Sequence, residues 1–262
     1  MMSLPSRERQ GWDSSLPLYG DVKSVTITQY NVMDRFGKIL RGEITWSKKF
    51  HFNADGDVIE STMHEIVGGK VIYKYDSAGK LIEKAWYSAY GDLGGKSIYK
   101  YDTSGNMIEE ASYDSFGMLH GKMINKYDAA GKKIEEARYN SDGSLDMRWI
   151  SKYDTAGNKI EEAKYNSDGS LNNKCIYKYD SAGKELEWGV YKSDGSLKRK
   201  SILKYDSAGN KIEDVGYNSF GSLMNTWIYK YDSFGSVIEA TKFEGEALIP
   251  ASQTILEITY RN

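Results

Sequence analysis

The sequence is poor in the residues that cross-link a chain, interrupt strands or bind metals. Its 262 residues include one cysteine (Cys175), three prolines and three histidines. A lone cysteine excludes an internal disulfide, and few prolines suit long ladders of backbone hydrogen bonds. No apolar run approaches the roughly 18 residues of a membrane-spanning helix. We therefore expect no disulfide framework and no transmembrane segment.

The chain also lacks a large excess of charge of either sign. The chain has 35 Lys and Arg against 37 Asp and Glu, a formal net charge of −2. A balanced charge provides no positive field that would attract the phosphates of nucleic acids or anionic lipids. We therefore exclude a nucleic acid as a partner.

Glycine and tyrosine are plentiful, and both recur at a fixed period. Seven Tyr-Asp dipeptides form a series at steps of 26 residues, and in each of these a glycine follows the tyrosine by four positions. Twelve residues after each tyrosine comes a second aromatic residue, and a second glycine follows the first six of these. The seven dipeptides begin at Tyr75, Tyr101, Tyr127, Tyr153, Tyr179, Tyr205 and Tyr231.

The period divides the chain. Residues 1–20 form an irregular N-terminal extension, and residues 21–262 form a single repeat domain. Within it, residues 71–243 hold the regular 26-residue repeats. Residues 21–70 and 244–262 contain drifted copies of the pattern, and atypical end repeats are typical of caps.

The glycines mark turns between strands. Asp154–Gly157 and Asn166–Gly169 each have a residue that favours the first position of a type I turn, followed by a glycine suited to a positive φ angle. Such turns connect antiparallel strands with a bulge. The segments between them are short and rich in Tyr and Ile, which favours strands over helices. We predict an all-β protein of tandem β-hairpin repeats.

The pairing implied by these turns places Ile150 opposite Glu162 and divides the side chains between two faces. One face carries an isoleucine row, and the other carries tyrosines. Both apolar rows are edged by charges, so neither face is clean enough for a sandwich. We therefore expect one elongated, twisted antiparallel sheet. A β-solenoid or a curled shell is the alternative.

The segment Tyr99-Lys100-Tyr101-Asp102-Thr103-Ser104-Gly105 and its copies resemble the YD-repeat (Rhs-like) family. The resemblance covers residues from about 70 to 243. It implies β-strands that build shells in bacterial secreted and cell-surface proteins. The chain departs from the family in its 26-residue period, which is longer, and in its second turn, Asn-Ser-Asp-Gly.

No set of residues indicates catalysis, a metal site or a cofactor. His51, His64 and His120 do not recur with the repeat, and Cys175 has no histidine partner in the pattern. Adjacent glutamates such as Glu135 and Glu136 point to opposite faces of a strand, so they cannot act as a glycosidase pair. The aspartate of each Tyr-Asp turn fits an Asx hydrogen bond better than a calcium site. We expect no cofactor and no metal.

One column of the repeat changes its residue between copies, and such a column is where function is expected. It reads Ser97, Met123, Trp149, Cys175, Ser201 and Trp227. Aromatic side chains of this kind serve as contacts for proteins or sugars, although they can also simply pack against their neighbours. The candidate binding surface is Trp149, Trp227, Tyr177 and Tyr229.

These observations favour a binding protein over an enzyme. An enzyme needs one singular site, whereas nearly every polar position here recurs in register. We expect a non-enzymatic structural or interaction scaffold of a bacterial surface, periplasmic or secreted assembly. It would bind a protein partner through an extended sheet face or through its ends. The alternative is a carbohydrate-binding module that uses Tyr and Trp platforms.

Overall fold

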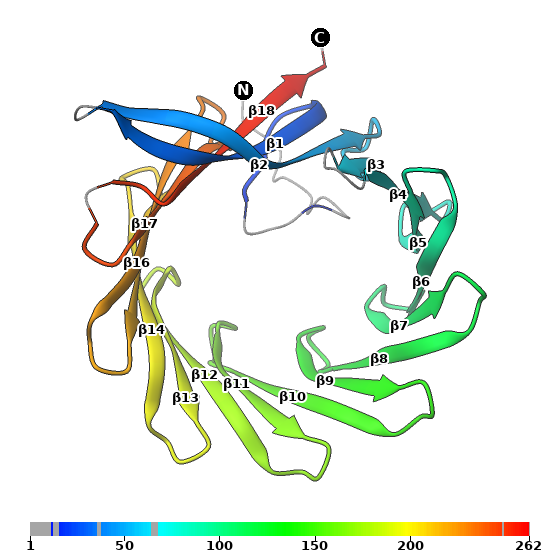
Figure 1. Ribbon diagram of the computed structural model, residues 1–262. Coiled ribbons are helices and arrows are strands. Elements are labelled where there is room, and N and C mark those ends of the chain that lie inside the picture. Colours follow the sequence, from blue (N-terminus) through cyan, green and yellow to red (C-terminus); the bar gives the residue numbers. More distant parts are fainter. Residues whose placement is uncertain (1–11, 13–15, 36–37, 64–67, 248, 262) are drawn as a thin grey trace.

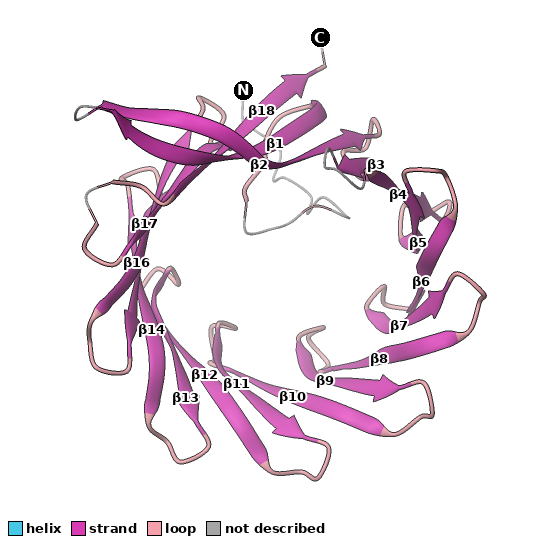
Figure 2. Cartoon of the chain, in the orientation of Figure 1, coloured by secondary structure: helices cyan, strands magenta, loops and turns pink. Residues whose placement is uncertain are grey.

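The computed structural model describes residue 12 and residues 16–35, 38–63, 68–247 and 249–261. These residues form strands joined by loops (Figure 2), and they include no helix able to cross a membrane. The eighteen strands are β1 (Val22–Arg35), β2 (Lys38–Phe52), β3 (Val58–Met63), β4 (Gly69–Tyr75), β5 (Leu81–Ser88), β6 (Leu93–Tyr101), β7 (Met107–Asp114), β8 (Leu119–Tyr127), β9 (Lys133–Asn140), β10 (Leu145–Tyr153), β11 (Lys159–Asn166), β12 (Leu171–Tyr179), β13 (Glu185–Lys192), β14 (Leu197–Tyr205), β15 (Lys211–Asn218), β16 (Leu223–Tyr231), β17 (Val237–Glu244) and β18 (Ser252–Tyr260).

The sheet closes on itself. Each strand pairs antiparallel with the next one in the chain, and β1 also pairs antiparallel with β18, for example Ile27 with Leu256. Figure 1 shows the resulting ring. The all-β prediction is confirmed, but the elongated sheet is wrong, and so are the solenoid and the curled shell. The protein is a closed 18-stranded barrel.

The barrel is wide, and its described residues leave part of the lumen open. At about 4.8 Å per strand, 18 strands close into a ring of roughly 14 Å radius before tilt widens it. The accessible surface is 15902 Å², whereas a compact protein of 29.6 kDa would expose about 11,600 Å². The excess indicates that neither face of the sheet is covered by a second layer of protein. Because neither face has to be covered, neither has to be fully apolar, and the fold needs no second sheet.

The turns have the predicted geometry. In Asp154–Gly157 the glycine has a φ of +94°, and its N–H donates to the Asp154 carbonyl at 3.0 Å. The Asp154 N–H donates to the Asn158 carbonyl at 2.9 Å. The second turns repeat this pattern, as at Asn166–Gly169. Because the chain is a meander, the Tyr-Asp turns lie at one end of the barrel, the first rim, and the second turns lie at the other, the second rim.

A bulge next to each turn shifts the register by one residue and corrects the predicted faces. Between β10 and β11 the shift falls after Lys152, so that Ile150 faces Ala163 and not Glu162. The extra residue of a bulge has no partner, and every side chain beyond it changes face. Lys152 consequently faces Glu161, and the two side chains form an ion pair at 2.8 Å.

The tyrosine of each Tyr-Asp dipeptide links two hairpins. The Tyr153 hydroxyl donates to the Lys133 carbonyl at 2.7 Å, twenty residues earlier in the chain. The same bond recurs at distances of 2.6 to 2.8 Å from Tyr101, Tyr127, Tyr179, Tyr205 and Tyr231. Burial, with smaller contributions from Asp206 and other neighbours, raises the pKa of Tyr231 to about 12, so its hydroxyl keeps the proton that it donates.

The main hydrophobic cluster lies where the two ends of the chain meet. It combines residues of β1, β2 and β3 with residues of β17 and β18, and it includes Leu18 from the N-terminal segment. Many of the buried apolar residues of the regular repeats are alanines, such as Ala111, Ala137 and Ala163. The cluster therefore stabilises the seam of the barrel. Its buried members are Leu18, Val22, Val25, Ile27, Phe50, Phe52, Val58, Tyr73, Val237 and Leu256.

We predict that Tyr153→Phe destabilises the fold by about 0.5–1.5 kcal/mol, because it removes the hydrogen bond of a half-buried hydroxyl. Tyr165→Phe is the matched control, since the Tyr165 hydroxyl makes no hydrogen bond within the described part of the chain. That control should change stability by less than about 0.5 kcal/mol. Urea denaturation followed by circular dichroism measures both. Equal losses in the two variants would contradict the role of the Tyr153 hydroxyl as a strut, that is, a side-chain hydrogen bond that links two neighbouring hairpins.

Candidate functional site: the inner wall and the second rim

The inner wall is identified by a cavity inside the ring. The cavity has a volume of about 530 Å³, and its lining comes from β1, β2, β4, β5, β16, β17 and β18 together with Trp12 and Leu16. Strands spread over this arc can share a cavity only on their concave side. Side chains alternate faces along each strand, so the register carries this assignment around the barrel. Trp227, for example, lines the cavity and pairs with Asp214, which therefore also faces inward.

All four residues of the predicted binding surface lie on the inner wall. Trp149 is on β10, Tyr177 on β12, and Trp227 and Tyr229 are on β16. The Trp227 and Tyr229 rings stack, with centroids 6.5 Å apart and planes 18° apart. Trp149 lies six strands from Trp227, a third of the way around the ring. The structure thus brings two of the four residues together and leaves the others separate.

The inner wall holds aromatic residues that the repeat pattern did not reveal. Trp188 on β13 pairs with Tyr177, and the Arg199 guanidinium lies 5.2 Å from the Trp188 ring centroid. Trp46 on β2 lines the cavity, and Trp12 meets Phe50 edge-on at 4.9 Å. Trp188 stands in a column whose other copies are not tryptophan. The appearance of a large aromatic residue in this column was the available signal.

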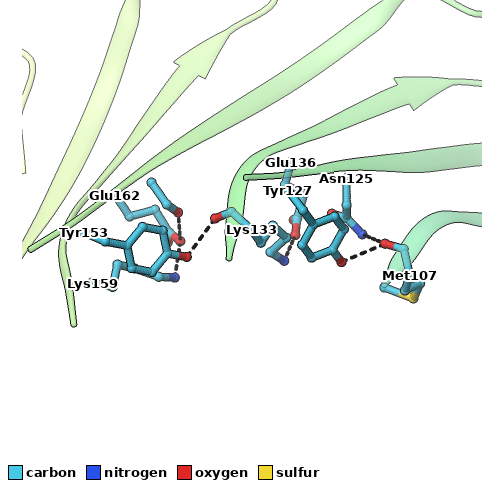
Figure 3. A network of polar contacts seen from close by, with 9 residues as sticks. Met107, Asn125, Tyr127, Lys133, Glu136, Tyr153, Lys159 and Glu162 are labelled. Atoms are coloured by element: carbon cyan, nitrogen blue, oxygen red, sulfur yellow. Dashed lines mark hydrogen bonds and ion pairs between the residues drawn. The ribbon is translucent and has the colours of Figure 1, made fainter. Parts of the chain in front are cut away.

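Many polar side chains of the inner wall are already paired. Lys133 contacts Glu136 at 2.5 Å and Lys159 contacts Glu162 at 2.7 Å. Figure 3 shows these pairs beside the Tyr127 and Tyr153 struts, whose hydroxyls reach the Met107 and Lys133 carbonyls. This part of the wall is a fixed polar network, which leaves its aromatic rings as the surfaces available for contact.

The outer wall is charged and regular. The lysine before each Tyr-Asp dipeptide forms a cross-strand ion pair with a glutamate at 2.6 to 2.9 Å, and these lysine side chains are 59–63% exposed. A row of half-buried isoleucines that includes Ile150 and Ile176 follows. Beyond it stands a second basic row. That row contains Lys96, Lys122, Arg148, Lys174 and Lys200.

The second rim has aromatic residues at the tips of three turns. Tyr90, Phe116 and Phe220 are 94%, 89% and 92% exposed. At the same turn position the other three copies have Asp142, Asp168 and Asp194. Tyr90 and Phe116 occupy neighbouring hairpins, about 10 Å apart at two strands per hairpin, and Phe220 stands across the mouth. The repeat alignment contains this signal, but the turn tips were not singled out from the sequence.

The remaining candidates do not converge on chemistry. Burial, and secondarily Glu162, raises the pKa of the Cys175 thiol, which leaves it protonated and a poor nucleophile near neutral pH. His51 lies on β2, His120 lies on β8, and His64 is outside the described residues. Within the described residues, no group of three or more His, Cys, Asp and Glu side chains is placed to hold a metal.

The aspartates of the first rim are used inside their own turns. Asp154 accepts hydrogen bonds from the Asn158 N–H at 2.8 Å and from the Asn158 side-chain amide at 3.0 Å. These bonds hold the pKa of the Asp154 carboxyl below its usual value. Asp102 and Asp206 accept the equivalent hydrogen bonds from Asn106 and Asn210, and their pKa is lowered in the same way. The structure thus shows the Asx hydrogen bond expected from the sequence.

Comparison with known proteins identifies a short family match. Residues 144–187 match a protein family of unknown function (DUF2963), and no curated protein matches. The prediction of YD-repeat (Rhs-like) membership is wrong, because this different family matches and the sheet closes into a barrel. The Tyr-Asp dipeptide recurs for a local reason. The aspartate accepts hydrogen bonds within its own turn, and the tyrosine hydroxyl donates one to the neighbouring hairpin.

Among solved structures, a porin-like protein from Bacteroides uniformis aligns with a TM-score of 0.49 and 8% identity, over 91% of this chain and 98% of that one. A putative outer membrane lipoprotein-sorting protein domain from Vibrio parahaemolyticus aligns with a TM-score of 0.21 and 10% identity, over 90% and 83%. A chain of the TcdB2-TccC3-Cdc42 structure aligns at 0.22 and 12%, over 80% of this chain and 16% of that one. With TM-scores below 0.5, these likenesses carry no conclusion about function.

We predict that acid destabilises the barrel partly through Asp102, Asp154 and Asp206. Their pKa is lower in the folded protein than the reference value of about 3.9. Their contribution is therefore present above that reference pKa and is lost as the pH falls through the folded pKa. Replacing all three with Asn, which the second turns use at Asn140 and Asn166, should flatten the melting temperature between about pH 4 and pH 2. An unchanged acid slope would contradict this assignment.

Proposed function

We propose that the protein is a non-enzymatic binding scaffold that contacts a protein partner at the second rim and along the inner wall. The observation that carries the proposal is the set of three aromatic turn tips, Tyr90, Phe116 and Phe220, which are about nine-tenths exposed. Large apolar side chains held out in water on rigid turns gain free energy when a partner covers them. Aromatic anchors are also the residues that dominate protein interfaces.

The positions of the three aromatic turn tips favour a specific contact over chance exposure. The same turn holds aspartate in three other copies, so an aromatic residue is not required for folding there. Tyr90 and Phe116 stand on one side of the mouth and Phe220 stands on the other. A partner that spans the mouth would touch both sides. A segment of that partner entering the lumen would meet Trp149 and Tyr177.

The described residues ahead of β1 support the proposed inner-wall contact, because Trp12 and Leu16 lie against that wall. Trp12 packs on Phe50 and Phe52, with ring centroids at 4.9 and 5.6 Å. The Pro17 carbonyl accepts a hydrogen bond from the Val237 N–H at 3.1 Å. Apolar side chains and backbone groups are both used. These are the contacts that a partner segment would make.

The outer wall is proposed to face water. A barrel embedded in a membrane presents an apolar band about 25 Å tall to lipid. Here the isoleucine row lies between the Lys–Glu pairs and the second basic row, and charges are expensive to place in hydrocarbon. A bacterial surface, periplasmic or extracellular location remains part of the proposal, with the barrel standing in solution or in an assembly.

A carbohydrate ligand is the second candidate, favoured by one small cavity. Its volume is about 180 Å³, and it lies between Trp188 and Trp227, with Arg199, Asp214 and Asn225 among its lining. Aromatic walls with a few polar groups suit a single sugar ring. A glycan array separates the two candidates, because saturable glycan binding that Trp188→Ala abolishes would favour this one.

We predict that the triple variant Tyr90→Asp, Phe116→Asp and Phe220→Asp keeps the fold and loses the partner. The substitutions install the residue that other copies carry, so the circular dichroism spectrum should not change. Binding of the partner, identified by capture with the wild-type protein and then purified, should weaken at least tenfold, about 1.4 kcal/mol. Tyr165→Ala on the outer wall is the control and should bind normally.

The inner wall is tested in the same assay. Trp149→Ala should weaken binding if a segment of the partner enters the lumen. If the triple variant binds the purified partner as tightly as wild type, the rim is not the contact surface and the proposal fails.

A further inference from the structure

The 530 Å³ cavity of the lumen combines aromatic walls with two lysines that form no ion pair within the described residues. The stacked Trp227–Tyr229 pair forms one wall, and Trp46 on β2 and Tyr73 on β4 also line it. Lys48 on β2 and Lys84 on β5 both line the same space. The volume lies within the roughly 300–1,000 Å³ that is typical of small-molecule sites.

The two lysines differ from other lysines of the inner wall. Lys133 and Lys159 each pair with a glutamate three residues further on. Lys48 and Lys84 form no ion pair with any carboxylate in the described ranges. Their neighbours are aromatic faces, with the Lys48 Nζ 4.7 Å from the Phe50 ring centroid and the Lys84 Nζ 5.8 Å from that of Tyr73.

This arrangement is electrostatically unfavourable without a ligand. Burial, and then the charge of Lys84, lowers the pKa of Lys48. Taking an ammonium group out of water is costly unless an opposite charge accompanies it. An anion between the two lysines would relieve both the desolvation and the repulsion, while the aromatic walls would contact an apolar group.

We propose that this cavity binds a small monoanionic amphiphile, with its anionic head between Lys48 and Lys84 and its apolar body against Trp46, Tyr73 and the Trp227–Tyr229 pair. The chemical class is a carboxylate or sulfonate on an aliphatic or aromatic body. This site lies on the arc of the inner wall that includes β2, β4, β5 and β16, whereas the proposed protein contact uses the second rim and the part of the wall around Trp149 and Tyr177.

Two fluorescent probes of similar apolar body and different charge test the proposal. 1-Anilinonaphthalene-8-sulfonate carries one negative charge, and N-phenyl-1-naphthylamine is neutral. With the full chain we expect saturable sulfonate binding at one site, displaced by dodecanoate and not by dodecanol at the same concentration. The variant Lys48→Gln with Lys84→Gln should weaken the sulfonate at least tenfold and change the neutral probe less than twofold.

Control variants separate this site from general charge effects. Lys133→Gln, on the inner wall but paired with Glu136 and outside the cavity, should leave both probes unchanged. So should Lys152→Gln on the outer wall. The triple rim variant should bind the sulfonate normally, and the Lys48/Lys84 variant should bind the protein partner normally. Failure of one proposal is therefore visible independently of the other.

Three results would overturn the inference. They are equal sulfonate binding by wild type and the Lys48/Lys84 variant, equal loss of both probes in a folded variant, and displacement by dodecanol as effective as by dodecanoate. If the double variant does not fold, the salt dependence of probe binding to the wild-type protein tests the inference instead. Raising the salt from about 0.01 to 1 M should weaken the sulfonate and not the neutral probe, and equal responses would overturn the inference.

Discussion

Closure of the sheet by β1 and β18 is the constraint on which the rest of the structure depends. An open sheet of 18 strands would leave two edges of unpaired backbone groups, which invite aggregation. Pairing β1 with β18 removes both edges and creates an inside and an outside. The two mixed faces of the sheet then acquire different surroundings, since one encloses the lumen and the other forms the outside of the barrel.

The apolar residues are distributed to support that closure. The regular repeats bury little more than alanines on their outer side and rely on backbone ladders, Asx turns, tyrosine struts and Lys–Glu pairs. The irregular ends hold the large buried side chains, including Val25 and Phe50 on one side of the seam and Leu256 on the other. The hydrophobic stabilisation is thus concentrated where no periodic interaction acts, between strands far apart in the sequence.

The local structure could be predicted from the sequence, and the global shape could not. The Asp154–Gly157 turn and the strands beside it follow from residues a few positions apart. The pairing of residues 22–31 with 252–260 has no periodic signature, because it joins two segments that depart from the repeat. These segments were interpreted as caps. A second bulge, in the strand beside each predicted turn, was missed, and this one-residue slip placed Glu162 opposite Ile150 where Ala163 stands.

The candidate site shows the same division. The repeat alignment identified Trp149 and Trp227 as members of a variable column, but their position on an inner wall follows only from closure. Lys48 and Lys84 could not have been grouped from the sequence, because their strands meet the Trp227–Tyr229 pair only across the seam. Phe116 is the opposite case. Its difference from Asp142 at the same repeat position was visible in the sequence. Only the location of both residues at a rim of the barrel was missing.

Cross-linking across the seam tests the closed barrel most directly. Thr26 on β1 faces Glu257 on β18, and directly paired residues of antiparallel strands lie within disulfide reach. In a Cys175→Ser background, Thr26→Cys with Glu257→Cys should form an intramolecular disulfide in nearly every monomer under mild oxidation. Thr26→Cys with Ile202→Cys, on a distant strand, should stay reduced. A seam pair that stays reduced, or that forms only disulfide-linked dimers, would contradict the closed barrel.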